Sequence, residues 1–228
     1  MRYYPVFLDL QNISCLVIGG GQVGERKVKT LQSCGAKVYL ISPELTPYLK
    51  GEIGQSRITW LAQSYQTEHL QDMSLVIGAT DDPKLNEKIG REAWERGMLV
   101  NIVDSPKECN FILPSLVSRG DLTLAISTAG KSPALAKKIR QDLEKQFPEI
   151  YGLYLELLGQ IRTHVLARGM SQKENKKIFE ALVNSPLLSW LEAGDLDSLY
   201  DLLDRLLDPP FPRSELTDIL NKILHPLQ

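Results

Sequence analysis

The sequence is poor in cysteine and has no long apolar run. Its 228 residues include three cysteines, Cys15, Cys34 and Cys109, an odd number whose spacing matches neither a disulfide framework nor a CxxC metal or redox pair. No stretch reaches the roughly eighteen apolar residues needed to cross a bilayer. The segment from Met1 to Leu10 also lacks the basic and apolar zones of a signal peptide. These absences predict a cytoplasmic protein with free thiols and no membrane association.

The sequence also lacks an excess of either charge. Its 26 Lys and Arg residues nearly balance 28 Asp and Glu residues, which gives a formal net charge of -2. Such a chain produces no general field that would attract nucleic acid, so an anionic ligand has to be bound by local groups. The histidines, His69, His164 and His225, form no HxxxH or HxxE pattern, and we expect no resident metal centre.

Between Asn12 and Thr128 the sequence alternates short apolar runs with amphipathic stretches. This alternation is typical of an α/β fold, in which parallel strands are joined by crossover helices. Runs such as LVIG and LTLAI are apolar at successive positions, as are strands covered on both faces. We expect strands at residues 15–18, 37–41, 58–61, 75–79, 99–103 and 122–126, and helices at 24–33 and 83–96.

After Ala129 leucine-rich helical segments replace the strand-like runs. One apolar stripe would lie along a single helix face and is formed by Leu196, Leu199, Leu202, Leu203 and Leu206. A stripe of this kind packs on its own domain or on a partner subunit. Because the stripes exceed what one short bundle needs to cover, we expect a homodimer. The DPPFP segment at 208–212 must interrupt the helix, since proline has no amide donor.

The strongest local signal is the GxGxxG segment of Gly19, Gly21 and Gly24, which follows the strand CLVI and precedes a helical stretch. A dinucleotide site needs the first glycine for a tight turn, the second so that the backbone can approach a pyrophosphate, and the third for close packing of helix on strand. The amides at the helix start then hold the phosphates. The alternative is a glycine-rich turn without a ligand.

About twenty residues further on, Ser42, Pro43 and Glu44 follow the strand KVYLI, where NAD-binding units carry an acidic side chain for the ribose. No Lys or Arg stands at this strand end to receive a 2′-phosphate, and Glu44 would repel one, so NAD is favoured over NADP. Thr80 and Asp81 should line the same crevice. Alternatively Asp81 or Asp82 caps the helix that begins at Pro83, and both readings can hold together.

Three further segments are more specific, namely NIVDSP at 101–106, FILPS at 111–115 and AISTAGKSP at 125–133. Together with VIGGGQVGERK and ATDDPKLN, they resemble the precorrin-2 dehydrogenase family, the dehydrogenase and ferrochelatase module of siroheme synthase. The resemblance runs in order from Tyr4 to about Leu166. It implies oxidation of precorrin-2 to sirohydrochlorin with NAD+ as hydride acceptor. In many members the same protein then inserts Fe2+, a lyase step that gives siroheme.

The resemblance also implies residue roles. The NAD site would use Gln22 and Val23 in the glycine loop, with Pro43 and Glu44 after the second strand. The acidic residue of the family's NVVD-type segment, tied to both activities, is Asp104 here. Larger siroheme synthases carry a fused methyltransferase domain, which we do not expect in this chain. Some members have a serine that can be phosphorylated where this chain has Thr128, so the resemblance does not carry that regulation over.

Asp104 is the predicted general base of the reaction. Removing a hydride from a reduced tetrapyrrole leaves a proton to be taken up elsewhere, and a carboxylate can accept it. We expect Asp104 at the carboxyl end of a central strand, partly desolvated, where open α/β sheets bind their ligands. In metal insertion it would take pyrrole protons or transiently hold the iron. The alternative is an Asx-type turn before Pro106.

Precorrin-2 carries several carboxylates, which call for cations or exposed amides around a broad cleft. The helix that starts in GKSPALAKKIR would supply both, with cations at Lys131, Lys137, Lys138 and Arg140, although each is equally well explained as part of a solvated basic face. The residues expected to bind the substrate are Asn101, Ser127, Thr128, Gly130, Lys131 and Ser132. His164 could assist iron insertion, but a single histidine is more often a packing residue.

The sequence thus predicts an NAD-binding Rossmann domain at 1–112, a dimerisation segment at 113–150 and a helical C-terminal domain at 151–228. Three classes of function stay open: an NAD-dependent dehydrogenase, a bifunctional dehydrogenase and ferrochelatase, and a noncatalytic NAD-sensing domain. A sensor would need the glycine loop alone. The segment around Asp104 and the basic helix therefore favour an enzyme.

Overall fold

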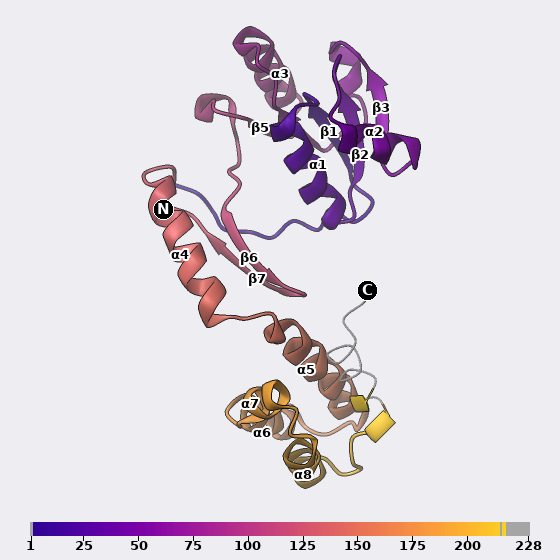
Figure 1. Ribbon diagram of the computed structural model, residues 1–228, viewed down its shortest axis with the longest axis vertical. Coiled ribbons are helices and arrows are strands. Elements are labelled where there is room, and N and C mark those ends of the chain that lie inside the picture. The colour runs from indigo at the N-terminus through magenta and orange to yellow at the C-terminus, as the bar shows by residue number, and fades with distance from the viewer. Residues whose placement is uncertain (1, 215, 218–228) are drawn as a thin grey trace. The chain divides into compact units, whose positions relative to one another are not determined.

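The computed structural model describes residues 2–214 and 216–217 (Figure 1). The chain divides into two compact units, Met1–Leu113 and Pro114–Gln228, and each is described by itself. The first contains the predicted parallel sheet and the second is mostly helical, so the expected fold class is confirmed. Among the described residues no helix combines the length and apolar character needed to span a membrane.

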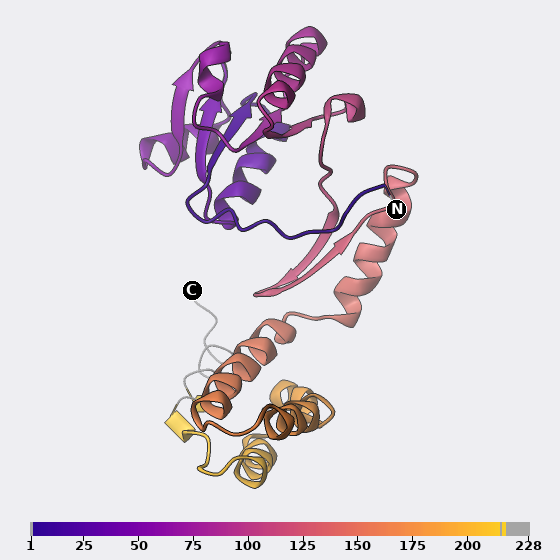
Figure 2. The same cartoon turned by 180° about the vertical axis from the view of Figure 1, so that it is seen from behind.

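The first unit is built on a five-stranded parallel sheet with the order β3-β2-β1-β4-β5 (Figures 1 and 2). Its strands are β1 (Ser14–Ile18), β2 (Lys37–Ile41), β3 (Thr59–Ala62), β4 (Leu75–Gly78) and β5 (Leu99–Ile102). Its helices are α1 (Gln22–Ser33), α2 (Pro47–Gly54) and α3 (Pro83–Glu95), with short 3-10 turns η1 (Thr67–Leu70) and η2 (Pro106–Glu108). All strands end at one edge, so the loops that follow them meet there.

Helices cover both faces of this sheet, as the successive apolar residues of its strands predict. In β1, Cys15 and Val17 pack with Val28 of α1 on one face. Leu16 packs with Ile89 of α3 on the opposite face. Because the strands are apolar on both sides, the sheet is a rigid support for the loops at its carboxyl edge.

The second unit begins with an antiparallel hairpin, β6 (Ser115–Arg119) and β7 (Leu122–Ile126), followed by α4 (Pro133–Gln146). The helices α5 (Ile150–Ala167), α6 (Gln172–Val183), α7 (Leu187–Ala193) and α8 (Leu196–Leu206) come next. The hairpin turn is Gly120-Asp121, and Gly120 has φ of 57°, a conformation that favours glycine. The turn packs closely on Gly152 of α5.

Two sequence predictions about strands are wrong. Residues 122–126 form a strand, but it pairs with β6 in the antiparallel hairpin instead of joining the parallel sheet. A two-residue loop that begins with glycine joins antiparallel neighbours and is too short for a crossover to a parallel strand. The strand before Asp104 is also misplaced, because β5 is the outermost strand of its sheet and not a central one.

The leucine stripe of α8 is covered within its own unit. Leu199 and Leu203 are fully buried in a cluster with Leu157 of α5, and the other leucines of the stripe are half-buried against it. The expected surplus of apolar surface is therefore not found on this helix. The DPPFP segment ends the helix as predicted, since α8 stops at Leu206 and Phe211 is buried in the same cluster.

Candidate active site

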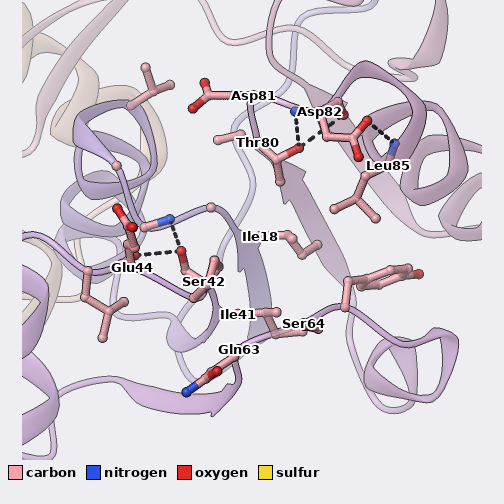
Figure 3. Close-up of a pocket in the computed structure, with 18 of the residues that line it drawn as sticks. Ile18, Ile41, Ser42, Glu44, Gln63, Ser64, Thr80, Asp81, Asp82 and Leu85 are labelled. Atoms are coloured by element: carbon pink, nitrogen blue, oxygen red, sulfur yellow. Dashed lines mark hydrogen bonds between the residues drawn. The ribbon is translucent and has the colours of Figure 1, made fainter.

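A cavity of about 860 Å³ opens at the carboxyl edge of the parallel sheet, within the range of about 300–1,000 Å³ typical of ligand sites (Figure 3). Four segments of the first unit line it: the glycine loop after β1, residues 42–46 after β2, residues 63–65 after β3 and residues 79–82 after β4. The cavity contains the expected cofactor residues Gly19, Gly21, Gln22, Val23, Ser42, Pro43, Glu44, Thr80 and Asp81. Gly24 lies outside it.

The glycine loop can hold its shape only with glycine at several positions. Gly19 has φ of 118°, and a Cβ there would overlap the Ala79 carbonyl. A Cβ on Gly24 would overlap the carbonyl of Gly19, so this glycine lets α1 approach the loop closely. Gly21 differs, because a Cβ built on it meets no atom within 4 Å. Its open side leaves room for a ligand to approach the backbone.

The N-terminus of α1 is suited to a pyrophosphate. Its N-cap residue is Gly21, which has no side chain to cap the helix. The first amides of a helix have no partner inside it and lie at the positive end of its dipole. Among the described residues that line the cavity there is no Lys or Arg, so these amides are its positive groups. The cradle fits a dinucleotide held through backbone amides.

The segment after β2 closes one end of the cavity. Glu44 is exposed there, with its carboxylate available to a ribose. Ser42 is almost fully buried, and its hydroxyl accepts a hydrogen bond from the Gly20 amide at 2.9 Å while donating to the Glu44 carbonyl at 2.7 Å (Figure 3). Of the three cofactor residues expected here, Ser42 and Glu44 therefore differ, since the Ser42 hydroxyl is already engaged within the protein whereas the Glu44 carboxylate is exposed.

In the segment after β4, Asp82 caps a helix and Asp81 faces the cavity, so each acidic residue has one of the two expected roles. Asp82 caps α3, because its carboxylate accepts from the amides of Lys84 at 2.9 Å and Leu85 at 3.3 Å. Asp81 is exposed on the cavity. The Thr80 hydroxyl donates to Asn86 at 2.8 Å, and the Asn86 amide donates back to the Thr80 carbonyl at 2.9 Å. This pair fixes the loop beside the cavity.

Sequence reasoning missed the segment after β3. Gln63, Ser64 and Tyr65 line the cavity, and the Tyr65 hydroxyl donates to Glu92 of α3 at 2.8 Å. Burial raises the pKa of Tyr65, with the hydrogen bond to Glu92 as the next cause, so this phenol stays protonated. These residues could have been predicted, because every parallel strand of the sheet ends at the same edge.

Asp104, the predicted general base, lies in a turn after β5. The Ser105 amide donates to the Ile102 carbonyl at 3.3 Å, and Asp104 has φ of 59°. The Val103 amide donates to Gly78 of β4 at 2.9 Å, which fixes the start of the turn to the sheet. Asp104 is exposed in the single chain and is not among the residues lining the cavity, so the expected desolvation is absent here.

The Cys109 side chain braces this turn, and Asn101 donates to its sulfur at 3.7 Å. The Cys109 sulfur accepts from the Ile102 amide at 3.1 Å and lies 3.3 Å from the Ser105 carbonyl, so it joins both ends of the turn. Asn101, expected to bind substrate, donates to the Phe111 carbonyl at 3.1 Å. No hydrogen bond to the Asp104 carboxylate is found in the described part of the chain. The Asx-turn alternative is therefore not what the structure has, and the carboxylate is available.

A cation near Asp104 was also missed. Lys27 of α1 is half-buried, and burial is the main cause that lowers the pKa of its ammonium. The charge of Arg26 lowers this pKa further, while the negative charge of Asp104 raises it. Lys27 thus lies close enough to Asp104 to interact with it. No sequence pattern separated Lys27 from the other basic residues of this helix.

The remaining substrate residues lie in the second unit, in the loop that leads into α4. The Thr128 hydroxyl donates to the Ser132 carbonyl at 3.1 Å and accepts from its amide at 3.3 Å. Ser127 accepts from the Ala129 amide at 3.1 Å, and Ser132 caps α4 through Leu135. These hydroxyls shape the loop. Gly130, with φ of 80°, and exposed Lys131 lie at its tip.

The cations of α4 differ in their availability. Arg140 forms an ion pair with Glu144 one turn further along the helix. Lys131, Lys137 and Lys138 are exposed and form no ion pair among the described residues. The three lysines are therefore free to meet an anionic ligand, whereas Arg140 is already neutralised.

The described histidines do not form a metal site. His164 lies with Nε2 3.1 Å from the Pro209 carbonyl and its ring 5.6 Å from that of Phe211, which is a packing arrangement. His225 lies outside the described residues. Within the described ranges no group of three or more His, Cys, Asp or Glu side chains lies together in a way that could hold a metal ion.

Two family models match the chain. Residues 6–115 match "Putative NAD(P)-binding", which agrees with the cofactor expected from the glycine loop, and residues 119–146 match "Sirohaem biosynthesis protein central". The first covers the parallel sheet with its cavity, and the second covers most of the hairpin and α4.

Relatives with similar sequences are siroheme synthases. That of Nitrosomonas europaea is 34% identical over 220 residues, covering 95% of this chain and 46% of that protein. Siroheme synthase 1 of Pectobacterium atrosepticum is 38% identical over 197 residues, covering 86% of this chain and 41% of that protein. The chain therefore spans less than half the length of these relatives.

Among solved structures, "SirC, precorrin-2 dehydrogenase" superimposes with a TM-score of 0.77 at 26% identity. The match covers 90% of this chain and 98% of that one, so it includes residues of both units. The sequence segments that resemble the family lie within the matched regions. The chain therefore belongs to the siroheme biosynthesis family that includes precorrin-2 dehydrogenase and the NAD(P)-binding and central domains of siroheme synthases.

Proposed function

We propose that this protein is a precorrin-2 dehydrogenase that uses NAD to produce sirohydrochlorin. The observation that carries the proposal is the pairing of a backbone cradle for a dinucleotide with an unengaged carboxylate at the same edge of the sheet. Similarity to SirC over nearly the whole of that chain supports the choice of substrate. A noncatalytic sensor would have no use for the braced turn that presents Asp104.

The cavity favours NAD over NADP. Glu44, Asp81 and Asp82 are its exposed acidic residues, and the described lining residues include no Lys or Arg to receive a 2′-phosphate. A further phosphate would therefore meet negative charge without a counter-charge. Bound NAD supplies the hydride acceptor.

In the proposed reaction Asp104 takes the proton that the substrate loses when a C–H bond gives up its hydride to the cofactor. No hydrogen bond or ion pair engages its carboxylate among the described residues, and Lys27 is near enough for the two charges to interact. The lysines at the start of α4 would hold substrate carboxylates, as would the loop of Ser127, Thr128, Gly130, Lys131 and Ser132. Asn101 would act through Cys109, which braces the turn and accepts from Asn101 at 3.7 Å.

An anaerobic assay of the purified protein with precorrin-2 and NAD+ tests this function. We expect the absorbance of sirohydrochlorin to appear, and no product with wild-type protein would overturn the proposal. Adding Fe2+ as a second substrate then tests iron insertion, for which Asp104 would accept pyrrole protons. Siroheme formation that exceeds the rate without protein would establish the bifunctional alternative.

We propose further that the protein is a cytoplasmic homodimer whose interface includes the hairpin in segment 113–150. Each strand of this two-stranded sheet pairs only with the other among the described residues, so both outer edges are open. Leu116 and Leu135 are 43% and 49% exposed on the hairpin and α4. An isolated hairpin is marginally stable, and a second copy would cover these groups. Three free cysteines agree with a reducing compartment.

Sedimentation of wild-type protein and of Leu116→Asp tests the dimer. We expect a dimer for the first and a monomer for the second. Leu166→Asp is the matched control, because Leu166 is similarly exposed on α5, away from the hairpin strands. A wild-type monomer, or a Leu116→Asp dimer as stable as the wild-type one, would contradict this interface.

A further inference from the structure

The buried hydroxyl of Ser42 joins the glycine loop to the segment after β2, the two parts of the cavity that would meet the pyrophosphate and the neighbouring ribose of a bound dinucleotide. It accepts from the Gly20 amide at 2.9 Å and donates to the Glu44 carbonyl at 2.7 Å (Figure 3). Gly20 belongs to the loop that would face the pyrophosphate, and Glu44 carries the carboxylate that would face the ribose. One side chain therefore connects phosphate binding to cofactor selection.

Ser42 is itself fixed to the sheet. Its amide donates to the Ala62 carbonyl at 3.1 Å, and its carbonyl accepts from the indole of Trp60 at 3.1 Å. Both partners belong to β3, so the backbone of Ser42 is held by the neighbouring strand. Only 5% of Ser42 is exposed. Its hydroxyl is thus a fixed point on the rigid part of the unit and not a mobile ligand contact.

The glycine loop lies against this point without spare room. A Cβ on Gly20 would overlap the Glu44 carbonyl and lie 2.9 Å from the Ser42 Cβ. Gly20 also accepts from the Thr46 amide at 3.2 Å, and the Gly19 amide donates to Ile41 at 2.9 Å. The loop and the segment after β2 are therefore held together by hydrogen bonds, with the Ser42 hydroxyl between them.

We propose that Ser42 is a positioning residue that couples the phosphate-binding loop to Glu44 and thereby sets the preference for NAD over NADP. It acts through Gly20 and Glu44 and does not bind the ribose directly. The proposal rests on the proposed function, because it assumes that the cavity takes a dinucleotide. Removing the hydroxyl leaves the buried Gly20 amide and the Glu44 carbonyl without their partner, so both segments can shift.

Calorimetric titration of the full-length protein with NAD+ and NADP+ tests this coupling without relying on turnover. We expect Ser42→Ala to raise the dissociation constant for NAD+ about tenfold, as loss of a buried hydrogen-bonded partner does. In Ser42→Ala the dissociation constant for NADP+ divided by that for NAD+ should fall to the value found in Glu44→Gln. In the double variant the ratio should not fall further, because both changes remove the same discrimination.

Hydrogen exchange supplies a second measurement on the protein without cofactor. The Gly20 amide should exchange faster in Ser42→Ala than in wild type. Ser33→Ala is the matched control, because it removes a serine hydroxyl that donates to the Thr30 carbonyl at 2.8 Å on the far end of α1. It should leave both dissociation constants unchanged. If Ser42→Ala does not fold, Ser42→Cys, with its weaker donor, should give a smaller change in the same ratio.

The possible failures can be told apart. A lowered melting temperature with an unchanged ratio would make Ser42 a structural residue and overturn the coupling. If the ratio of dissociation constants falls further in the double variant than in either single variant, the coupling is overturned as well. If wild-type protein binds neither dinucleotide, the proposed function itself fails, whereas NAD+ binding that Ser42→Ala leaves intact removes only the role of Ser42.

Discussion

At the scale of single residues, the backbone conformation of Asp104 is as informative as its carboxylate. Its φ of 59° lies in the left-handed region, where Asn and Asp are tolerated better than most residues. Uncommon conformations of this kind collect at functional sites when the surroundings hold them. Here the surroundings are the Cys109 sulfur and the Ile102–Ser105 turn. Chemistry and conformation therefore have to be tested with different substitutions.

We expect Asp104→Asn to abolish turnover while leaving NAD binding and the free energy of unfolding unchanged, because Asn adopts the same conformation but is not a base. Asp104→Ala should also abolish turnover, with an additional loss of stability of about 1 kcal/mol for the left-handed conformation. Steady-state assays, NAD titrations and urea unfolding measure the three quantities. Dehydrogenation retained in both variants would remove Asp104 from the role of general base.

Glu52 of α2 should make the stability of the first unit depend on pH. Its buried carboxylate accepts from Arg57 and from Gln32 of α1 at 2.7 Å, and these hydrogen bonds lower its pKa from 4.5 to about 2. A carboxylate with a lowered folded-state pKa stabilises the fold above its unfolded-state pKa and loses that contribution as the pH falls. The loss should therefore extend from about pH 4.5 down to about pH 2.

Urea unfolding of wild type and Glu52→Gln at several pH values checks this. We expect the wild type to lose more stability than Glu52→Gln between pH 5 and pH 3, since the variant has no carboxylate to protonate. At neutral pH the variant should be the less stable protein. If the free energy of unfolding of the two proteins fell equally with pH, the Glu52 ion pair would not contribute to stability.

At the scale of elements, the sequence predicts the parallel strands well because their pattern is local. Residues 37–41 form β2 with the predicted bounds, and the other strands of the parallel sheet deviate by about one residue at an end. Apolar residues at successive positions identify such strands, and the strand ends then identify the cavity edge. This is why most residues that line the cavity could be predicted from the sequence.

The hairpin and α2 were missed although their signals are present. SLVSR-GD-LTLAI contains two apolar runs separated by Gly-Asp, which is a hairpin signature. Thr46-Pro47 is a capping residue followed by proline at the first helical position. The proximity of Lys27 to Asp104 has no such signal, because it depends on how α1 packs over the sheet. Long-range packing of this kind cannot be derived from local periodicity.

The hairpin turn gives a prediction at this scale. Gly120→Ala should destabilise the second unit by about 1 kcal/mol or more, because φ of 57° is unfavourable for alanine and the Cβ would lie 3.4 Å from Gly152. Gly159→Ala is the control. It lies inside α5 with open space around its Cβ position and should stabilise that helix by up to about 1 kcal/mol. Thermal unfolding that moves equally for both variants would contradict the role of the turn.

At the scale of the whole molecule, the residues lining the cavity all belong to Met1–Leu113. A ligand that binds only the native state stabilises it by about 2.7 kcal/mol at a concentration a hundred times its dissociation constant. NAD+ should therefore protect the first unit against unfolding. Since none of the described residues beyond Leu113 lines the cavity, the helical core around Leu157 and Leu203 should gain protection only to the extent that the units unfold together.

Hydrogen exchange followed peptide by peptide separates these effects. With saturating NAD+ we expect slower exchange in the glycine loop and in β1, β2 and β4, together with a higher melting temperature. Gly21→Asp should lose both responses, because the new side chain would fill the open side of the loop and place a negative charge where the pyrophosphate lies. Gly51→Asp is the control, since Gly51 has equally open space but lies on α2 outside the cavity. Protection that persists in Gly21→Asp would mean that the dinucleotide does not contact this loop.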